Sequence, residues 1–160
     1  MDKATELGLI DRILGHIDAR TTDMSEATST LPVSRYFDPD RFALEQKHVF
    51  GQLPRAVGHI SQIPNPGDFF TLEAGDQPVL IVRTADGGVN AFLNVCRHRG
   101  ARLEWDAAGC GRKRFTCKYH GWVYSPDGAL VGVPGSDGFP ELNRDLHGLS
   151  RLPVEVRHGF

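Results

Sequence analysis

Two short segments that each combine one cysteine with one histidine restrict this chain more than any other feature. They are Cys96-Arg97-His98 and Cys117-Lys118-Tyr119-His120, and eighteen residues separate them. Each segment offers one thiolate and one imidazole, so two loops that face each other would supply two sulfur and two nitrogen ligands to one metal centre. The sequence therefore predicts a fold that brings two distant loops together.

A set of two cysteines and two histidines suits either a tetrahedral zinc ion or a two-iron, two-sulfide cluster in which histidines replace two of the cysteines. Structural zinc fingers usually place the cysteines in one half and the histidines in the other. Here each half is mixed, which favours the two-iron cluster, with Cys96 and Cys117 on one iron and His98 and His120 on the other. A zinc-binding interaction module and ordinary buried polar residues remain the alternatives.

Composition excludes several other classes of protein. The chain has 160 residues, enough for one domain with a small appendage, and its three cysteines argue against a disulfide scaffold and for a cytoplasmic setting. The third, Cys110, lies between two glycines and is predicted to be a free thiol. A net charge of −2 gives no reason to expect nucleic acid, and the longest apolar run, residues 79–82, excludes a membrane span.

The first fifty residues predict two helices. Residues 5–20 carry Leu7, Ile10, Leu14 and Ile17 at helical spacing, whereas residues 21–30 are rich in Thr and Ser and predict a loop. The second helix is predicted over residues 39–50. It begins with Asp38 as N-cap and Pro39 as first residue, ends before Gly51, and is expected to turn Phe42 and Val49 inward.

Beyond Gly51 the pattern changes to short β-branched and aromatic segments separated by Pro, Gly, Asn and Asp. Strands are predicted at residues 55–60, 69–73, 78–83, 89–95, 114–116, 122–124 and 154–160, with a hairpin turn at residues 86–88. Many short strands with tight turns indicate an antiparallel β-barrel or sandwich. The fold class is therefore mostly β, with two cluster-binding hairpin loops after short N-terminal helices.

The two ligand segments, extended to Cys-Arg-His-Arg-Gly and Cys-Lys-Tyr-His-Gly-Trp, resemble the cluster-binding loops of Rieske oxygenases, the α subunits of aromatic ring-hydroxylating dioxygenases. The resemblance runs from about Tyr36 to the last residue. It divides the chain into an N-terminal helix and loop, residues 1–35, and a Rieske domain, residues 36–160. Val133-Pro134-Gly135 resembles the proline-containing loop that covers the cluster in this family.

The resemblance is to the oxygenase type of Rieske protein. The respiratory type adds a second cysteine to each loop and a serine after the second His-Gly, whereas this chain has Ala101, Tyr119 and Trp122 at those places. Tyr124 keeps the position of a tyrosine that donates a hydrogen bond to a cysteine sulfur.

The resemblance also implies partners. Electrons are expected to come from a reductase or ferredoxin and to pass to a mononuclear non-haem iron in a second domain, whose two-histidine, one-carboxylate triad this sequence does not show. The expected whole is a trimeric oxygenase that uses NADH and dioxygen, with this chain as its N-terminal piece. The alternative is a stand-alone Rieske ferredoxin, which the two N-terminal helices disfavour.

Basic residues gather around the two ligand segments. Seven lie between Arg97 and Lys118, against two acidic residues, so this region is positive while the rest of the chain is negative. Two interpretations are open: a surface that steers an acidic electron donor, or a solvated charged loop.

Overall fold

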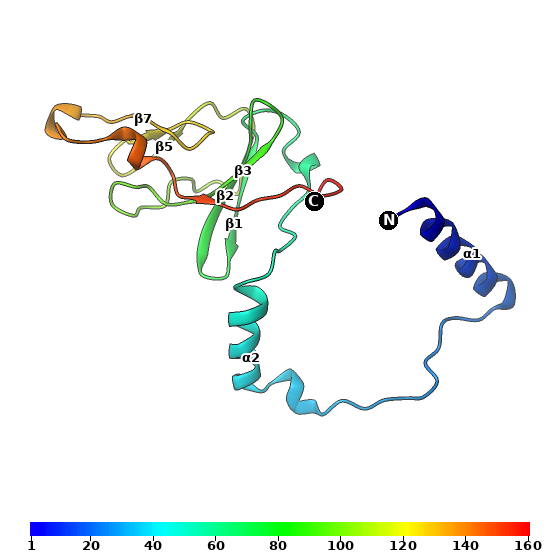
Figure 1. The fold of residues 1–160 in the computed structure, drawn as a ribbon. Helices are drawn as coiled ribbons and strands as arrows, with labels where there is room; N and C mark the ends of the chain where they lie inside the picture. Colours follow the sequence, from blue (N-terminus) through cyan, green and yellow to red (C-terminus); the bar gives the residue numbers. More distant parts are fainter. The chain divides into compact units, whose positions relative to one another are not determined.

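The computed structural model describes all 160 residues and divides them into two units, Met1–Val49 and Phe50–Phe160. The first unit holds helix α1 (Lys3–Ala19), a 3-10 helix η1 (Val33–Tyr36) and helix α2 (Pro39–Glu45), which continues as a π-helix η2 (Gln46–Phe50) (Figure 1). None of the helices could span a lipid bilayer. The domain boundary predicted at residue 36 stays a prediction.

Local capping explains where these helices begin. The Asp2 side chain accepts a hydrogen bond from the Thr5 N–H at 2.9 Å, and the Asp38 side chain accepts from the Asp40 N–H at 2.9 Å. Both predicted helices are confirmed, but the inward orientation expected for Phe42 and Val49 is wrong. Phe42 is 57% and Val49 43% exposed, because no residue of Met1–Val49 is buried and the unit has no core to receive them.

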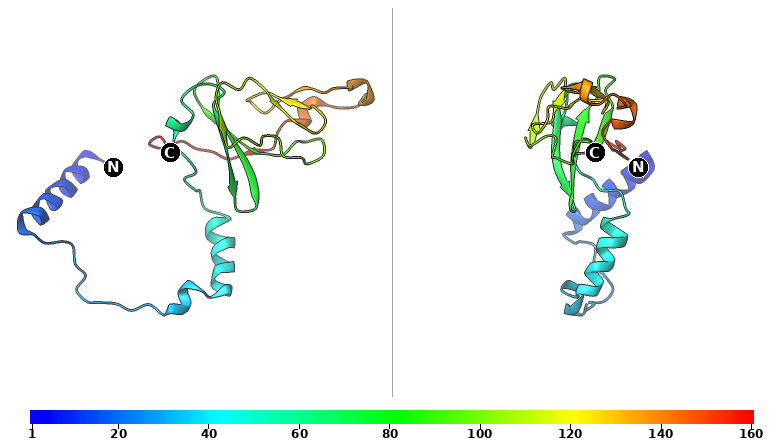
Figure 2. Two further views of the ribbon diagram at one scale, coloured as in Figure 1. Left: turned by 180° about the vertical axis from the view of Figure 1, so that it is seen from behind. Right: turned by 90° about the vertical axis from the view of Figure 1, so that its left-hand side faces the viewer.

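The second unit is built from eight antiparallel strands in two sheets. One sheet has the order β4-β1-β2-β3-β8 and the other the order β5-β6-β7. The green strands of the larger sheet and the yellow segment that carries the smaller one can be followed in Figure 2. The strands are β1 (Phe69–Ala74), β2 (Gln77–Arg83), β3 (Val89–Leu93), β4 (Ala108–Gly109), β5 (Phe115–Thr116), β6 (Val123–Tyr124), β7 (Leu130–Gly132) and β8 (Arg151–Leu152), with 3-10 helices η3 (Ile60–Gln62), η4 (Ser136–Gly138) and η5 (Arg144–His147). The mostly-β antiparallel prediction is confirmed.

The predicted hairpin turn is also confirmed. It joins β2 to β3, and its ends are tied by the Thr84 N–H, which donates to the Gly88 carbonyl at 3.0 Å. Two predicted strands are wrong. Residues 55–59 have no strand partner and lead into η3, where the His59 side chain caps the helix. Residues 154–160 end in a turn in which Arg157 and Phe160 exchange backbone hydrogen bonds at 2.9 Å, so the alternating apolar pattern there does not form a ladder.

Strand β2 separates two apolar clusters, because its alternating side chains are buried on both faces. Val79 and Ile81 pack with Ile63 and Ala91 on one face. Leu80 and Val82 face the larger core on the other side. That core also contains Cys96, Cys117, Trp122 and Tyr124, together with Phe69, Phe92, Leu103, Phe115, Leu130, Val133 and Leu149. The two cysteines of the ligand segments are therefore anchored in the main core.

Candidate metal centre

The first ligand loop, residues 96–101, is a tight turn with two backbone hydrogen bonds. The Cys96 N–H donates to the Ala101 carbonyl at 2.8 Å, and the Gly100 N–H donates to the Cys96 carbonyl at 3.0 Å. Gly100 has φ +71°, in the left-handed region that favours glycine. Below the loop, Val95 and Arg102 form an antiparallel bridge.

The second ligand loop, residues 117–122, repeats this construction. The Cys117 N–H donates to the Trp122 carbonyl at 2.8 Å, and the Gly121 N–H donates to the Cys117 carbonyl at 2.9 Å. Gly121 has φ +72°, and the loop is closed below by the pairing of Thr116 with Val123 in β5 and β6. The two segments that were recognised by their Cys/His content therefore share one backbone design.

Different side chains support the two loops. Below the first loop, the buried Asn94 amide donates to the Glu104 carbonyl at 2.7 Å and accepts from the Glu104 N–H at 2.8 Å. Ahead of the second loop, the Asp68 carboxylate accepts from the Gly111 N–H at 2.9 Å. Hydrogen bonds from the Asn65 and Gly111 backbone amides lower the pKa of Asp68, so its charged form is the one that holds the segment.

Both ligand-loop cysteines are buried thiols without a disulfide partner. Tyr124 connects them to the core: its hydroxyl oxygen accepts from the Arg97 N–H at 3.0 Å and lies 3.3 Å from the Cys96 Sγ. Burial, and then the contact with Cys96, raise the pKa of Tyr124, so its hydroxyl stays protonated and can donate to the sulfur when Cys96 is a thiolate. Burial also raises the pKa of Cys96, and ligation by a cation is what would stabilise its thiolate.

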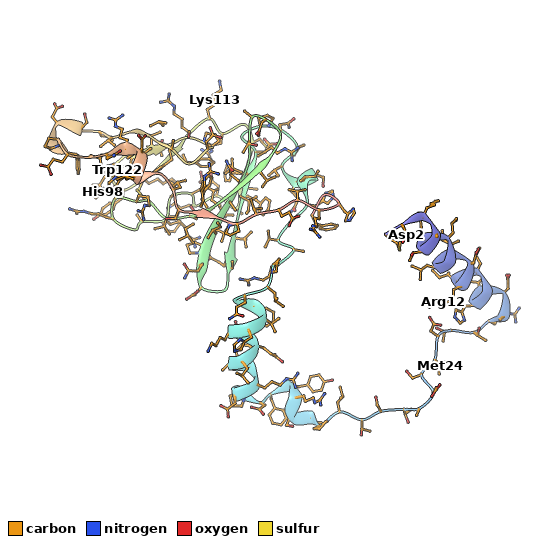
Figure 3. All side chains as sticks on the ribbon, in the orientation of Figure 1. Asp2, Arg12, Met24, His98, Lys113 and Trp122 are labelled. Carbon is orange, nitrogen blue, oxygen red and sulfur yellow. The ribbon has the colours of Figure 1, made fainter.

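The two loop histidines face each other, with ring centroids 4.7 Å apart. His98 is half-buried. Its burial and the nearby positive charges of His120 and Arg99 lower the pKa of His98, which favours the neutral imidazole that can bind a metal. His120 is exposed and contacts the Tyr119 ring, whose centroid lies 3.8 Å away. Figure 3 shows His98 beside Trp122 at the end of the domain where the ligand loops lie.

The four predicted ligands are thus brought together as two pairs, a buried sulfur pair and a more exposed imidazole pair. A tetrahedral zinc ion needs four donors around one point, whereas a two-iron cluster takes the sulfurs at one end and the imidazoles at the other. The donor set fits the cluster. Cys110 is exposed and belongs to neither pair.

Pro134 packs against the second ligand loop. A Cβ atom on Gly121 would lie 3.0 Å from the Pro134 Cγ, whereas a Cβ on Gly100 would meet nothing within 4 Å. The segment that resembles the covering loop of the family therefore lies over only one of the two glycines.

Sequence reasoning did not identify two residues near the centre. Asn94, which supports the first loop, carries only a weak signal, a polar residue at the end of an apolar strand. Phe139, whose ring contacts both His98 and Trp122, carries none, because it lies in a stretch rich in Gly and Pro with no periodicity.

The basic residues around the loops fall into two groups. Arg102 pairs with Glu73, and Arg112 pairs with Glu104 and Asp106, so both acidic residues of this region are neutralised. The other five are exposed and form no ion pair, and we call them the free basic group: Arg97, Arg99, Lys113, Arg114 and Lys118. Figure 3 shows Lys113 projecting from the surface of the domain.

Fold and donor set together fit an iron–sulfur protein with mixed cysteine and histidine ligands. Comparison with known families agrees: the profile of the Rieske [2Fe-2S] domain matches residues 54–143. The chain therefore belongs to the Rieske [2Fe-2S] domain family.

Similar proteins are subunits of oxygenases. The chain is 40% identical to the biphenyl 2,3-dioxygenase subunit alpha of Rhodococcus jostii (strain RHA1) over 86% of its own length and 30% of the relative. It is 38% identical to the glycine betaine monooxygenase oxygenase subunit of Chromohalobacter salexigens over 100% of its own length and 36% of the relative. The chain thus spans about a third of these curated relatives.

A solved structure supports the same relationship. Naphthalene 1,2-dioxygenase from Rhodococcus sp. superposes with a TM-score of 0.74 and 32% sequence identity, over 81% of this chain and 30% of the dioxygenase chain.

Proposed function

We propose that this chain is the electron-transfer part of a Rieske oxygenase α subunit, with Cys96 and Cys117 binding one iron and His98 and His120 binding the other. The observation that carries the proposal is the pairing of the four side chains on two loops of the same backbone design. A bound Rieske cluster supplies a one-electron carrier whose histidine ligands raise its potential above that of an all-cysteine cluster.

The sulfur end and the imidazole end of the proposed centre have different surroundings. The core buries both thiols, which excludes water from the sulfur end, and Tyr124 donates to the Cys96 sulfur, which stabilises added negative charge there. The imidazole end lies nearer the surface, with His120 exposed. Electrons leave through the edge of one of these two imidazoles.

The acceptor in this proposal is a mononuclear iron in a catalytic domain of the same kind of oxygenase. The whole enzyme uses NADH and dioxygen to oxidise an aromatic or related organic substrate, in the cytoplasm and as a homo-oligomer, a trimer in the family that the chain resembles. The support is the similarity to dioxygenase and monooxygenase subunits over nearly the whole chain.

The electron donor is an acidic ferredoxin or reductase domain. The free basic group supports this assignment, because five unpaired positive charges near the ligand loops would accelerate the encounter with a negative partner. The rate at which a reduced acidic ferredoxin reduces the chain is expected to fall with rising salt. It is also expected to fall in the Arg99→Glu and Lys118→Glu variants, but not in Lys47→Glu, outside the second unit. A rate that is independent of salt and charge would contradict this donor surface.

Isolation of the chain without chelators tests the ligand set. Two irons and two acid-labile sulfides per chain are expected, with an EPR signal after reduction that shows coupling to two imidazole nitrogens. Colourless protein that binds one zinc ion and contains no acid-labile sulfide would instead identify the zinc alternative.

A further inference from the structure

The His98 imidazole contacts two aromatic rings, Trp122 and Phe139, whereas His120 has one such neighbour besides His98, the exposed Tyr119 ring. Trp122 stacks on His98 with ring centroids 4.8 Å apart and an angle of 9° between the planes. Phe139 approaches edge-on, at 5.8 Å and 87°. The two aromatic residues also contact each other at 6.0 Å and 81°. We call Trp122 and Phe139 the aromatic clamp.

Trp122 is a rigid half of the clamp. It is 3% exposed and packs in the main core, and its carbonyl accepts the hydrogen bond that closes the second ligand loop. The ring that stacks on the first-loop histidine therefore belongs to the second loop. Trp122 also contacts the His147 ring edge-on, with ring centroids 6.2 Å apart.

Phe139 is the more accessible half of the clamp. It follows η4, and its N–H donates to the Ser136 carbonyl at 2.9 Å, while its own carbonyl accepts from the Leu142 N–H at 3.1 Å. These bonds hold the backbone at a tight turn. The side chain is 38% exposed, so the fold does not need it to fill the core. Its aromatic contacts are with His98 and Trp122.

His120 lacks this support. Its ring contacts are His98 and Tyr119, and the Tyr119 side chain is itself 60% exposed. The two imidazoles therefore differ in their aromatic neighbours and in their exposure to water.

We propose that Trp122 and Phe139 are positioning residues that fix the plane of the His98 imidazole and shield it from water, and thereby set the reduction potential of the centre. The inference rests on the proposed ligand role of His98. Reduction adds one negative charge to the centre, and water near a ligand stabilises that charge. Shielding of His98 therefore lowers the potential.

The test compares Phe139→Ala with Phe37→Ala in the cluster-loaded chain. Phe37 is an equally large ring that is 70% exposed in the first unit, so its truncation is the matched control. The midpoint potential is expected to shift to a more positive value in Phe139→Ala and to stay unchanged in Phe37→Ala. Pulsed EPR is expected to show a broadened nitrogen coupling for one of the two imidazoles and an unchanged coupling for the other.

A second pair of variants tests Trp122. Trp122→Phe keeps a ring that can stack on His98 and is expected to retain the nitrogen couplings, whereas Trp122→Leu is expected to broaden one of them. If Trp122→Leu fails to fold, the comparison of Phe139→Ala with Phe37→Ala decides alone.

The outcomes separate the two proposals. A wild-type chain that shows no imidazole coupling would overturn the ligand set and this inference with it. A wild-type chain with both couplings, but with Phe139→Ala indistinguishable from Phe37→Ala in potential and couplings, would overturn the aromatic clamp and leave the ligand set intact.

Discussion

The two ligand loops share a backbone and differ in almost everything around it. In both loops the cysteine N–H donates a hydrogen bond across the turn, and the glycine four residues later has φ near +70°. The residues that flank each loop also pair with each other, Val95 with Arg102 and Thr116 with Val123. The first loop rests on a buried amide, Asn94, and its histidine is enclosed by aromatic rings. The second is covered by Pro134, and its histidine is exposed.

The backbone of the loops and the environment of the loops therefore have separate roles. The shared turn brings one thiol and one imidazole to the centre from each side. The unequal surroundings give the two imidazoles different contact with water and the two sulfurs different donors, with the Tyr124 hydroxyl on Cys96. Variants that act on one loop at a time can separate these roles.

Removal of a ligand should have the largest effect and should be equal for the two loops. Cys96→Ser and Cys117→Ser are each expected to abolish cluster assembly, because the ligands cross-link two segments that are distant in sequence. Iron and acid-labile sulfide analysis measures this, with Cys110→Ser as the control that keeps full occupancy. Substantial cluster occupancy in only one of the two variants would show that the two loops do not contribute equally to cluster assembly.

Alanine substitution of the two turn glycines should destabilise the two loops by different amounts. Gly100→Ala is expected to cost about 1 kcal/mol of unfolding free energy, from left-handed backbone strain alone. Gly121→Ala carries the same strain and also forces its Cβ against the Pro134 ring, so about 3 kcal/mol is expected. Chemical denaturation measures both. Equal losses would show that Pro134 does not constrain the second loop, and the double variant Gly121→Ala/Pro134→Ala should recover part of the difference.

Removal of the Tyr124 hydroxyl should weaken the hydrogen bonding of the first ligand loop only. Tyr124→Phe deletes the donor to the Cys96 sulfur and leaves the Arg97 N–H without its acceptor, so a loss of about 2 kcal/mol is expected. A more negative midpoint potential is also expected, because the reduced centre loses a stabilising hydrogen bond. Tyr119→Phe is the control, since the Tyr119 side chain is exposed. Equal potentials for the two variants would contradict the donor role of Tyr124.

The weakest effect is expected for a pH dependence of the segment between the two ligand loops, where Asp68 accepts from the Gly111 N–H. The pKa of Asp68 is lowered by the amides of Asn65 and Gly111, so its stabilising contribution is complete above the unfolded value of about 4 and is lost as the pH falls through the lower folded value. Asp68→Asn should lower Tm at pH 7, and the gap to the wild type should narrow below about pH 4. Asp127→Asn, an exposed carboxylate, is the control. A gap that does not change with pH would show that the charge of Asp68 is not what anchors the segment.

The sequence predicted the strands of the main sheet because their apolar and β-branched residues carry a local pattern. β1, β2 and β3 were predicted to within two residues, and so was the turn between β2 and β3. The same kind of pattern was misleading at residues 154–160, where no partner strand pairs with the segment, and at Phe42, where no core is present to bury the ring. A local pattern states what a segment is able to bury, and whether it is buried depends on a neighbour.

The donor set could be predicted from the sequence alone, since Cys96, His98, Cys117 and His120 carry their chemistry in any conformation and their mixed spacing favours a two-iron cluster. The surroundings of these four residues follow from the way the chain packs and could not be predicted locally. Tyr124 reaches Cys96 across 28 positions, and Phe139 reaches His98 from a segment without any local pattern. Local periodicity does not encode contacts between segments so far apart. These contacts form only when the core packs, and they give two loops with the same backbone different surroundings.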